Sequence, residues 1–435
     1  MKVVVIGIGR VGLVAACCLA DAGHRVTGIE INHRTLELMN SGVVPYHEPE
    51  LEELLKHGLQ AGNLKFTEVL PGSLKTDIVM IAVNTPAMPD GTCNLSHVYT
   101  VVAQVRDVLD GPTIMVMKST VPPGTGVRLI KDYLQGMPIT YISNPEFLRG
   151  GQGVYDWYHP PRIVIGTNDN RAADKLSLVY SGIQAPVLVT DITSAEMIKS
   201  ASNTFLVTKV SFINEIANIC EAVGADIDDV ARGMGLDPRI GPAFLQAGLG
   251  YGGSCLPKDA TALDSLASSK GYDFKVLKAA IEANTKQRRL VVDNLKQLLG
   301  SLKGKKVALL GLAFKPGTDD ITGASALDIA YLLTAEGANV RAYDPAAMEK
   351  ARALLLDSVV FAKDIYSATV GACAIILATE WPEFIEADWD RIKKTMVKPY
   401  AVLDGRNALP RDRLIAIGFR YRGIGRAAAE KLTEA

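Results

Sequence analysis

The first 30 residues constrain the fold of this chain more than any other stretch. An apolar run beginning at Lys2 is followed by three glycines in the spacing G-x-G-x-x-G: Gly7, Gly9 and Gly12. The first glycine permits a tight turn, the second a close approach of a pyrophosphate, and the third close packing of a helix on a strand. A helical segment and a second apolar run ending at Glu30 complete the pattern. The stretch therefore predicts a dinucleotide-binding strand–helix–strand unit, with a glycine turn that binds nothing as the alternative.

Glu30 bears on which dinucleotide binds. A carboxylate at the end of the second strand accepts hydrogen bonds from the ribose hydroxyls and repels a 2′-phosphate, which favours NAD over NADP. Arg34 follows four residues later and leaves that preference open.

A chain of 435 residues is too long for one core and predicts two or three domains. Short apolar runs bounded by turn residues predict strands of a parallel α/β sheet in the first 190 residues. These strands are expected within 2–7, 24–30, 76–83, 112–119, 139–143, 161–166 and 185–190.

The pattern changes after residue 192. Long helical periodicities cover 194–224 and 274–299, and alternation then returns with strands expected within 305–311, 338–345, 372–379 and 400–405. We predict an N-terminal domain over 1–192, a central helical domain over 193–302 and a C-terminal α/β domain over 303–435. The expected fold class is two Rossmann-like, doubly wound α/β domains joined by a central helical region.

Composition excludes several classes of protein. The formal net charge is -1 with 21% charged residues, so no nucleic acid or membrane partner is expected. The chain opens directly into a strand-like run and has no long apolar segment, which favours a cytoplasmic protein. The histidines all precede residue 160 without metal-ligand spacing, and the cysteines form no C-x-x-C pair, so we expect no metal and no disulfides.

Cys255 stands in an unusual setting. The loop "AGLGYGGSCLPKD" places glycines before it, Lys258 three residues after it and Asp259 next. Glycines allow close approach to a ligand, and a nearby cation favours a thiolate. A nucleophilic role and a plain turn are both open from these residues alone. Cys17, Cys18, Cys220 and Cys373 are expected to be small buried side chains.

A nucleophilic cysteine beside a nicotinamide site predicts a specific chemistry. A thiolate captures an aldehyde as a thiohemiacetal, and a second hydride loss gives a thioester that water cleaves to an acid. Lys199 and Asn203, spaced i, i+4, share a helix face where they could hold an oxyanion, although a solvated helix face is the alternative. Glu146 and Thr120 each follow a predicted strand, where ligand-binding loops gather.

The motifs together resemble the UDP-glucose 6-dehydrogenase and GDP-mannose 6-dehydrogenase family across nearly the whole chain. They are "GIGRVG", "KSTVPPGT", "NPEFLRGG", "AEMIKSASNTFLVTKVSFINEIA", "GYGGSCLPKD", "GLAFKPGTDDI" and "DGRN". The resemblance implies an NAD domain, a helical dimerisation region and a C-terminal domain for the nucleotide of a UDP-sugar. It further implies a homodimer with shared active sites.

The resemblance also implies residue roles. Cys255 is the nucleophile, Lys199 and Asn203 hold the reacting oxygen, and Asp259, Thr120 and Glu146 position water and move protons. Lys258, Thr85 and Thr120 lie near the cofactor, together with Gly7, Gly9, Gly12 and Glu30. The implied substrate contacts, besides Lys199 and Asn203, are Phe147, Leu148, Arg239, Tyr251, Gly252, Lys315 and Arg406, with Arg239 reaching the neighbouring subunit's site.

Some positions depart from the family pattern. Gly150 stands where a glutamate is usual, Pro161 replaces an aspartate, and "TGA" from Thr322 replaces "RES". Asn84 replaces a glycine in "VNTP". These changes bear on sugar contacts and cofactor preference, and none touches the implied chemistry.

The leading hypothesis is an NAD-dependent four-electron oxidation of UDP-glucose to UDP-glucuronate. GDP-mannose or another UDP-hexose is the alternative substrate, because "SCLPKD" also occurs in GDP-mannose enzymes. A two-electron 3-hydroxyacid dehydrogenase of related architecture needs no cysteine, so Cys255 discriminates against it. A non-catalytic nucleotide-sugar sensor is a further alternative, and it has no need of the reactive side chains.

Overall fold

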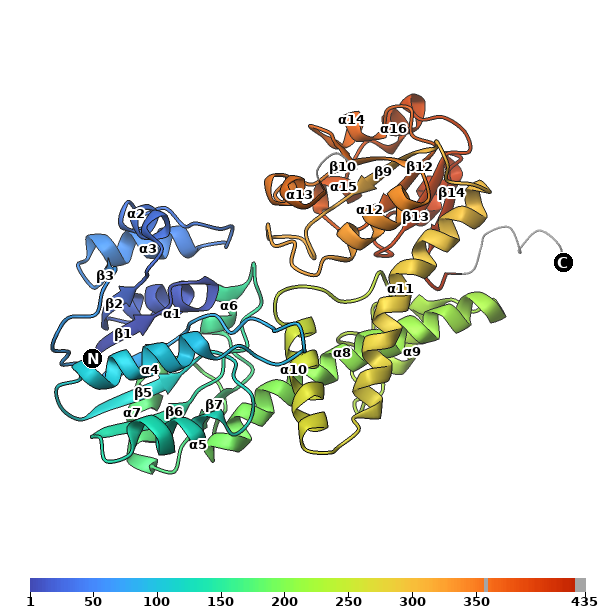
Figure 1. The fold of residues 1–435 in the computed structure, drawn as a ribbon. Coiled ribbons are helices and arrows are strands. Elements are labelled where there is room, and N and C mark those ends of the chain that lie inside the picture. Colours follow the sequence, from blue (N-terminus) through green and yellow to red (C-terminus); the bar gives the residue numbers. More distant parts are fainter. Residues whose placement is uncertain (356–358, 427–435) are drawn as a thin grey trace. The chain divides into compact units, whose positions relative to one another are not determined.

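The computed structural model describes residues 1–355 and 359–426 (Figure 1). These residues form two compact units. The first consists of 1–202 with 261–272, and the second of 203–260 with the described residues from 273 onward. Each unit is built around its own α/β sheet.

Within residues 1–202, all of which are described, eight strands form one sheet in the order β3-β2-β1-β4-β5-β6-β7-β8. The strands are β1 (Lys2–Ile6), β2 (Arg25–Ile29), β3 (Leu64–Thr67), β4 (Ile78–Ile81), β5 (Thr113–Met117), β6 (Ile139–Ser143), β7 (Ile163–Gly166) and β8 (Val187–Thr190). β1 to β6 run parallel, whereas β7 pairs antiparallel with β6 and parallel with β8.

Helices cover both faces of this sheet. They are α1 (Arg10–Asp21), α2 (His33–Asn40), α3 (Leu51–Gln60), α4 (Ser96–Val108), α5 (Thr125–Leu129), α6 (Gly153–Tyr158) and α7 (Asn170–Ser177), with short helices η1 (Ile130–Leu134) and η2 (Leu178–Tyr180). One core lies between the sheet and α1, and a second packs against α4. β4 and β5 are buried along their whole length, as expected of a parallel sheet covered on both sides.

Four helices make up the central region: α8 (Ile192–Val223), α9 (Ile227–Gly235), α10 (Leu256–Ser269) and α11 (Lys275–Leu299). The side chains of Ile213, Ile227 and Val291 belong to the same core as the C-terminal sheet. The second unit therefore includes most of the central helices and not the C-terminal domain alone.

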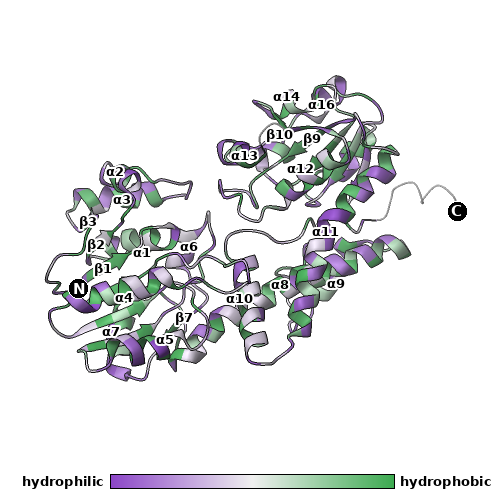
Figure 2. Ribbon diagram, viewed as in Figure 1, coloured by the Kyte–Doolittle hydropathy of each residue, from purple (hydrophilic) through white to green (hydrophobic). Residues whose placement is uncertain are grey.

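Among the described residues from 306 to 423, six strands form a parallel sheet in the order β11-β10-β9-β12-β13-β14. They are β9 (Lys306–Leu310), β10 (Asn339–Tyr343), β11 (Val359–Phe361), β12 (Ala374–Leu377), β13 (Ala401–Asp404) and β14 (Arg420–Gly423). The helices are α12 (Ser325–Ala335), α13 (Met348–Leu355), α14 (Ile365–Thr369), α15 (Pro382–Ile385), α16 (Trp389–Thr395) and α17 (Arg411–Ala416). In Figure 2 β9 is mostly green, in agreement with its sequence KVALL, of which the last four residues are buried.

The predicted fold class is confirmed: two Rossmann-like α/β sheets and a helical central region. The expectation of a wholly parallel N-terminal sheet is wrong for β7 and β8, which run against the other strands. The three short strands β3, β11 and β14 had not been predicted. Among the described residues, no helix is both long and apolar enough to cross a membrane.

Candidate active site

The glycine-rich turn has the geometry that its spacing predicts. Gly7 has a φ of +89°, and a Cβ there would meet the backbone of Ala82 and Val83 at 2.8 Å. A Cβ at Gly12 would lie 2.0 Å from the carbonyl oxygen of Gly7, so helix α1 packs too closely for any other residue. Gly9 differs, because a Cβ there would meet only the Asn84 side chain, at 3.9 Å. The space in front of Gly9 fits the close approach of a pyrophosphate.

Glu30 follows β2 and lies beside this turn. Its carboxylate accepts hydrogen bonds from the backbone N–H of Ile8 at 3.2 Å and of Asn32 at 2.8 Å. These bonds fix the carboxylate at the carboxyl edge of the sheet, where the ribose of a dinucleotide is held in this fold.

Thr85 and Thr120 come from neighbouring loops, which follow β4 and β5. The Thr85 hydroxyl donates to the carbonyl oxygen of Thr120 at 2.9 Å, and the Ser119 hydroxyl donates to that of Val83 at 2.7 Å. The structure thus brings together two of the residues predicted to lie near the cofactor.

Glu146 and Lys199 form a buried ion pair. The Lys199 ammonium lies 3.0 Å from one carboxylate oxygen of Glu146, and both side chains are about 5% exposed. The other oxygen accepts the N–H of Leu148 at 2.6 Å, and the Phe147 ring centroid lies 5.3 Å from the ammonium. Removing Lys199 would leave a buried carboxylate without its cation, a change that costs about 3–5 kcal/mol in comparable sites. Lys199 is therefore not on a solvated helix face.

The cysteine loop is shaped by contacts within its own unit. A Cβ at Gly250 would lie 2.3 Å from the Asn284 side chain, and one at Gly252 would lie 2.3 Å from the carbonyl oxygen of Gly323. At Gly253, with a φ of +91°, it would meet the Phe314 ring at 2.9 Å. The glycines are thus required for packing of the loop, and the approach of a ligand to them stays a prediction.

Cys255 is exposed and directly precedes α10. The N–H of Asp259 donates to the Cys255 carbonyl oxygen at 2.9 Å, so the two residues are one helical turn apart. The predicted burial of Cys17, Cys18, Cys220 and Cys373 is confirmed, and desolvation raises the pKa of each of these thiols.

Asp259 is the centre of the polar contacts in this part of the second unit. Its side chain is 2% exposed. One oxygen accepts from the Asn203 amide at 2.6 Å, and the other from the Lys258 ammonium at 2.6 Å. Three predicted catalytic or cofactor residues are therefore joined by charge-assisted hydrogen bonds. Lys199 lies one turn before Asn203 on α8, so the helix presents both on one side.

The predicted substrate residues of the second unit occupy several loops. Tyr251 is buried, and its backbone N–H donates to the Asn284 side chain at 2.8 Å.

The cationic residues predicted to contact the substrate differ in their surroundings. The Arg406 guanidinium donates to the carbonyl oxygens of Ala378 at 2.8 Å and Phe314 at 3.2 Å. The Lys315 ammonium lies 5.7 Å from the Phe314 ring centroid. Arg239 differs from these residues, because its side chain is 87% exposed and pairs with the carboxylate of Asp237 at 2.6 Å, two residues earlier.

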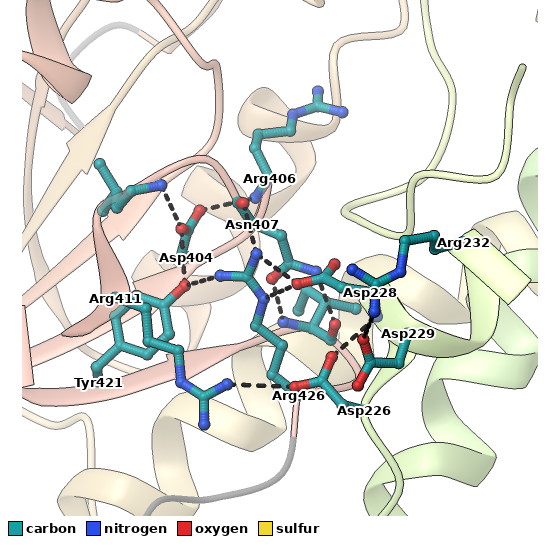
Figure 3. A network of polar contacts seen from close by, with 12 residues as sticks. Asp226, Asp228, Asp229, Arg232, Asp404, Arg406, Asn407, Arg411, Tyr421 and Arg426 are labelled. Carbon is teal, nitrogen blue, oxygen red and sulfur yellow. Dashed lines mark hydrogen bonds and ion pairs between the residues drawn. The ribbon is translucent and has the colours of Figure 1, made fainter. Parts of the chain in front are cut away.

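A polar network around the "DGRN" loop had not been predicted (Figure 3). Buried Asp404 accepts from the N–H of Arg406 at 3.1 Å and from the Tyr421 hydroxyl at 2.9 Å. Arg426 donates to that hydroxyl at 2.7 Å and pairs with Asp228, which is next to the start of α9. The network holds the loop that carries Arg406 against a central helix. The contacting residues are far apart in sequence, so no local signal identified it.

The structure shows the surroundings of three departures from the family pattern, at Gly150, Thr322 and Asn84. A Cβ at Gly150 would meet no atom within 4 Å, and the Thr322 carbonyl oxygen accepts the N–H of Gly253 at 2.8 Å. Asn84 is the side chain nearest to Gly9. Among the described residues, no group of three or more His, Cys, Asp and Glu side chains has the arrangement of a metal site.

The chain combines a glycine-rich dinucleotide-binding turn, a second Rossmann-like sheet and a cysteine in an exposed loop. This combination is typical of one class of oxidoreductases. The chain belongs to the UDP-glucose/GDP-mannose dehydrogenase family. It matches the family's NAD-binding domain over residues 1–184, its central domain over 193–286 and its UDP-binding domain over 308–411. The resemblance inferred from the motifs is confirmed, and the chain is an NAD-binding dehydrogenase.

Individual relatives extend over the whole chain. It is 43% identical over 433 residues to UDP-glucose 6-dehydrogenase TuaD of Bacillus subtilis, covering 98% of this chain and 94% of that one. A solved UDP-glucose dehydrogenase from Pyrobaculum islandicum has a TM-score of 0.89 and 38% identity, with 98% of each chain covered. A UDP-D-ManNAc dehydrogenase from Pyrococcus horikoshii has a TM-score of 0.87 and 29% identity, covering 98% of this chain and 100% of that one.

Proposed function

We propose that this protein catalyses the NAD-dependent four-electron oxidation of UDP-glucose to UDP-glucuronate. The observation that carries the proposal is an exposed cysteine, Cys255, one helical turn from the buried carboxylate of Asp259. A two-electron dehydrogenase needs no such nucleophile. The names of relatives about 40% identical over nearly the full chain support glucose as the sugar.

The C6 alcohol of the sugar first loses a proton and a hydride and becomes an aldehyde. The Cys255 thiolate then adds to the aldehyde carbon and forms a thiohemiacetal. Loss of hydride from that adduct leaves a thioester on Cys255, and water then releases the carboxylate and restores the thiol. NAD, held by the Gly7–Gly12 turn and Glu30, supplies the hydride acceptor for both oxidations. Capturing the aldehyde as a covalent adduct keeps the half-oxidised sugar on the enzyme.

The polar residues have separate roles in this proposal. Lys199, with its charge balanced by Glu146, and Asn203 stabilise the oxyanion of the alkoxide and thiohemiacetal stages. Asp259 accepts a proton from the attacking water, and Thr120 with Glu146 helps to position that water. The contacts that support these assignments are the Glu146–Lys199 pair at 3.0 Å and the Asn203–Asp259 hydrogen bond at 2.6 Å.

Substrate recognition is assigned to residues of several loops. In our proposal Lys315 and Arg406 contact the nucleotide diphosphate, whose negative charge their cationic side chains complement. Tyr251 and Gly252 line the sugar-binding side of the cysteine loop, and Phe147 and Leu148 contribute from the Glu146 loop. Lys258 and Thr85 complete the proposed cofactor contacts.

The proposal is tested by the NADH formed per sugar consumed. UDP-glucose, UDP-galactose, UDP-N-acetylmannosamine and GDP-mannose are offered separately, each with NAD or NADP. We expect two NADH per UDP-glucose. Formation of one NADH per sugar would mean that the reaction stops at the aldehyde, which would contradict the thioester route. Formation of two NADH with a different sugar only would make that sugar the substrate. No NADH with any of the sugars would favour a non-catalytic sensor.

An apolar stripe on α8 supports a homodimer. Phe205, Phe212, Ile219 and Val223 recur along the helix at spacings of seven or four residues, and they are 49–72% exposed. Large apolar side chains in a continuous exposed row indicate a protein interface. We propose that two copies pair along this stripe and that the exposed Arg239 of each reaches the substrate of the other.

Phe212→Glu is expected to convert the dimer to a monomer, because a charge would be buried at the centre of the stripe. Sedimentation velocity measures the change. If Arg239 acts across the interface, kcat/KM for the sugar should fall at least about tenfold in the monomer. Tyr331→Glu, an aromatic-to-acid change at a 72% exposed residue of α12, is the control. A dimeric, fully active Phe212→Glu protein would contradict this interface.

A further inference from the structure

Glu196 is a buried carboxylate on α8 that the proposed chemistry does not use. It lies one turn before Lys199 and is 2% exposed. Its two oxygens accept the backbone N–H groups of Gly124 at 2.7 Å and Gly126 at 2.8 Å. Both glycines belong to the segment 119–126, which follows β5, carries Thr120 and ends in the first turn of α5. All of these residues lie in the first unit.

The segment between Thr120 and Gly124 is short and stiff. Val121 is buried, and Pro122 and Pro123 each have a fixed φ. The Thr120 carbonyl oxygen is held at one end by the Thr85 hydroxyl at 2.9 Å, and Gly124 is held at the other by Glu196. A displacement of Gly124 would therefore be transmitted to Thr120 and not absorbed in between.

The packing around Glu196 leaves no room for the segment to move inward. A Cβ at Gly126 would lie 2.5 Å from the Tyr141 ring and 3.0 Å from a Glu196 oxygen. Arg128 of α5 and Tyr141 of β6 face the carboxylate from the elements packed against it. A buried carboxylate that is bonded to backbone N–H groups rather than to a bidentate cation is costly to ionise. That cost indicates that the two hydrogen bonds hold the Gly124–Gly126 backbone in one position.

We infer that Glu196 is a positioning residue that ties the Thr120 segment to the turn of α8 that bears Lys199. This inference rests on the roles proposed above for Thr120 and Lys199. Glu196 itself touches neither substrate nor cofactor in this scheme. Its carboxylate sets the separation of two groups that must act on one reacting carbon, and small displacements of such groups reduce the rate far more than binding.

The bonds require an ionised carboxylate. Burial raises the pKa of Glu196 to about 7, and the N–H groups of Gly126 and Gly124 offset part of that rise. Below this pH one oxygen becomes a hydroxyl, which is a much weaker acceptor for the N–H of its glycine. Because the folded pKa lies above the ordinary value of 4.5, the contribution of Glu196 to stability is fully present below about pH 4.5 and is lost as the pH rises towards and through 7. The order of the segment, and hence kcat, should instead increase as the pH rises, because the hydrogen bonds form with the ionised carboxylate.

The first experiment compares the wild type with Glu196→Gln, which keeps the shape but sets an amide N–H against a backbone N–H. We expect kcat to fall about 10- to 100-fold and both KM values to change by less than about threefold. The loss of wild-type kcat below about pH 7 should be absent in the variant. Asp77→Asn is the control, because Asp77 also accepts a backbone N–H, at 2.9 Å, but precedes β4 at the opposite edge of the sheet. Unchanged kcat, or an unchanged acid limb, would overturn the inference.

A second measurement does not depend on activity. Amide hydrogen exchange of the peptide covering 119–126, corrected for intrinsic rates, should lose protection in Glu196→Gln and, in the wild type, between pH 8 and pH 6. If the variant does not fold, the wild-type pH series alone decides, and constant protection overturns the inference. If no nucleotide sugar is oxidised but protection behaves as expected, the proposed function fails while the tie between Glu196 and the segment stands.

Discussion

Replacing Cys255 by serine should lower the steady-state rate with UDP-glucose at least about a thousandfold, because a hydroxyl is a far poorer nucleophile than a thiolate. The hydride loss that produces the aldehyde does not need the thiol, so a slow first oxidation should remain. The variant should therefore form at most one NADH per sugar. Stopped-flow absorbance of NADH, with mass spectrometry of the intact protein for the absent thioester, measures both effects.

The matched control for this change is Cys220→Ser. Cys220 is buried near the end of α8, and desolvation raises the pKa of its thiol, so it is poorly suited to act as a nucleophile. Its replacement should cost some stability and leave two NADH per sugar. A Cys255→Ser enzyme that still forms two NADH at an appreciable rate would rule out the thioester and return the cysteine loop to a structural role.

The fold was largely predictable because its strands are buried. Apolar runs such as 76–83 and 112–119 stand out in sequence since both faces of β4 and β5 are covered. The missed strands are three or four residues long, and β14 reads RYRG with exposed and half-buried positions. Their pairing depends on neighbours that are distant in sequence. The antiparallel orientation of β7 could not be predicted either, because an apolar run reads the same for a parallel and an antiparallel strand.

The candidate site was predictable to the extent that its residues lie in compact motifs. Gly7, Gly12 and Cys255 could be recognised from the spacing of their motifs. The carboxylates that Lys199 and Asn203 contact could not be predicted in this way. Lys199 meets a carboxylate 53 residues away, and Asn203 meets one 56 residues away. These contacts follow from the folded path of α8.

The purpose of the cysteine-loop glycines shows the same limit. The sequence predicted close approach of a ligand, and the structure adds that Gly250 and Gly252 are needed because Asn284 and Gly323 pack against them. A glycine-rich pattern shows that the backbone needs room, but it does not show which group fills that room. The packing partners are 34 and 71 residues away, so they could not be predicted from the motif alone.

Replacing Asp259 by asparagine should separate the two halves of the proposed reaction. The amide keeps the size of the side chain, but it cannot take a proton from water and no longer neutralises Lys258, 2.6 Å away. Thioester hydrolysis should become the slow step, with turnover reduced about 100- to 1,000-fold. Rapid mixing should still show a burst of NADH. The sugar thioester on Cys255 should then accumulate, and mass spectrometry of the peptide that contains Cys255 should detect it.

Asp273→Asn makes the same chemical change in an ion pair, because Asp273 lies 2.6 Å from the Lys278 ammonium, but the side chain is 58% exposed. Exposed pairs contribute little to stability, so this variant should behave as the wild type. If Asp259→Asn slows turnover with no burst and no acyl-enzyme, Asp259 acts before the thioester forms, through the Asn203 amide that it holds. If turnover is unchanged, the proton acceptor is another group, and the one-turn spacing of Cys255 and Asp259 has only a structural meaning.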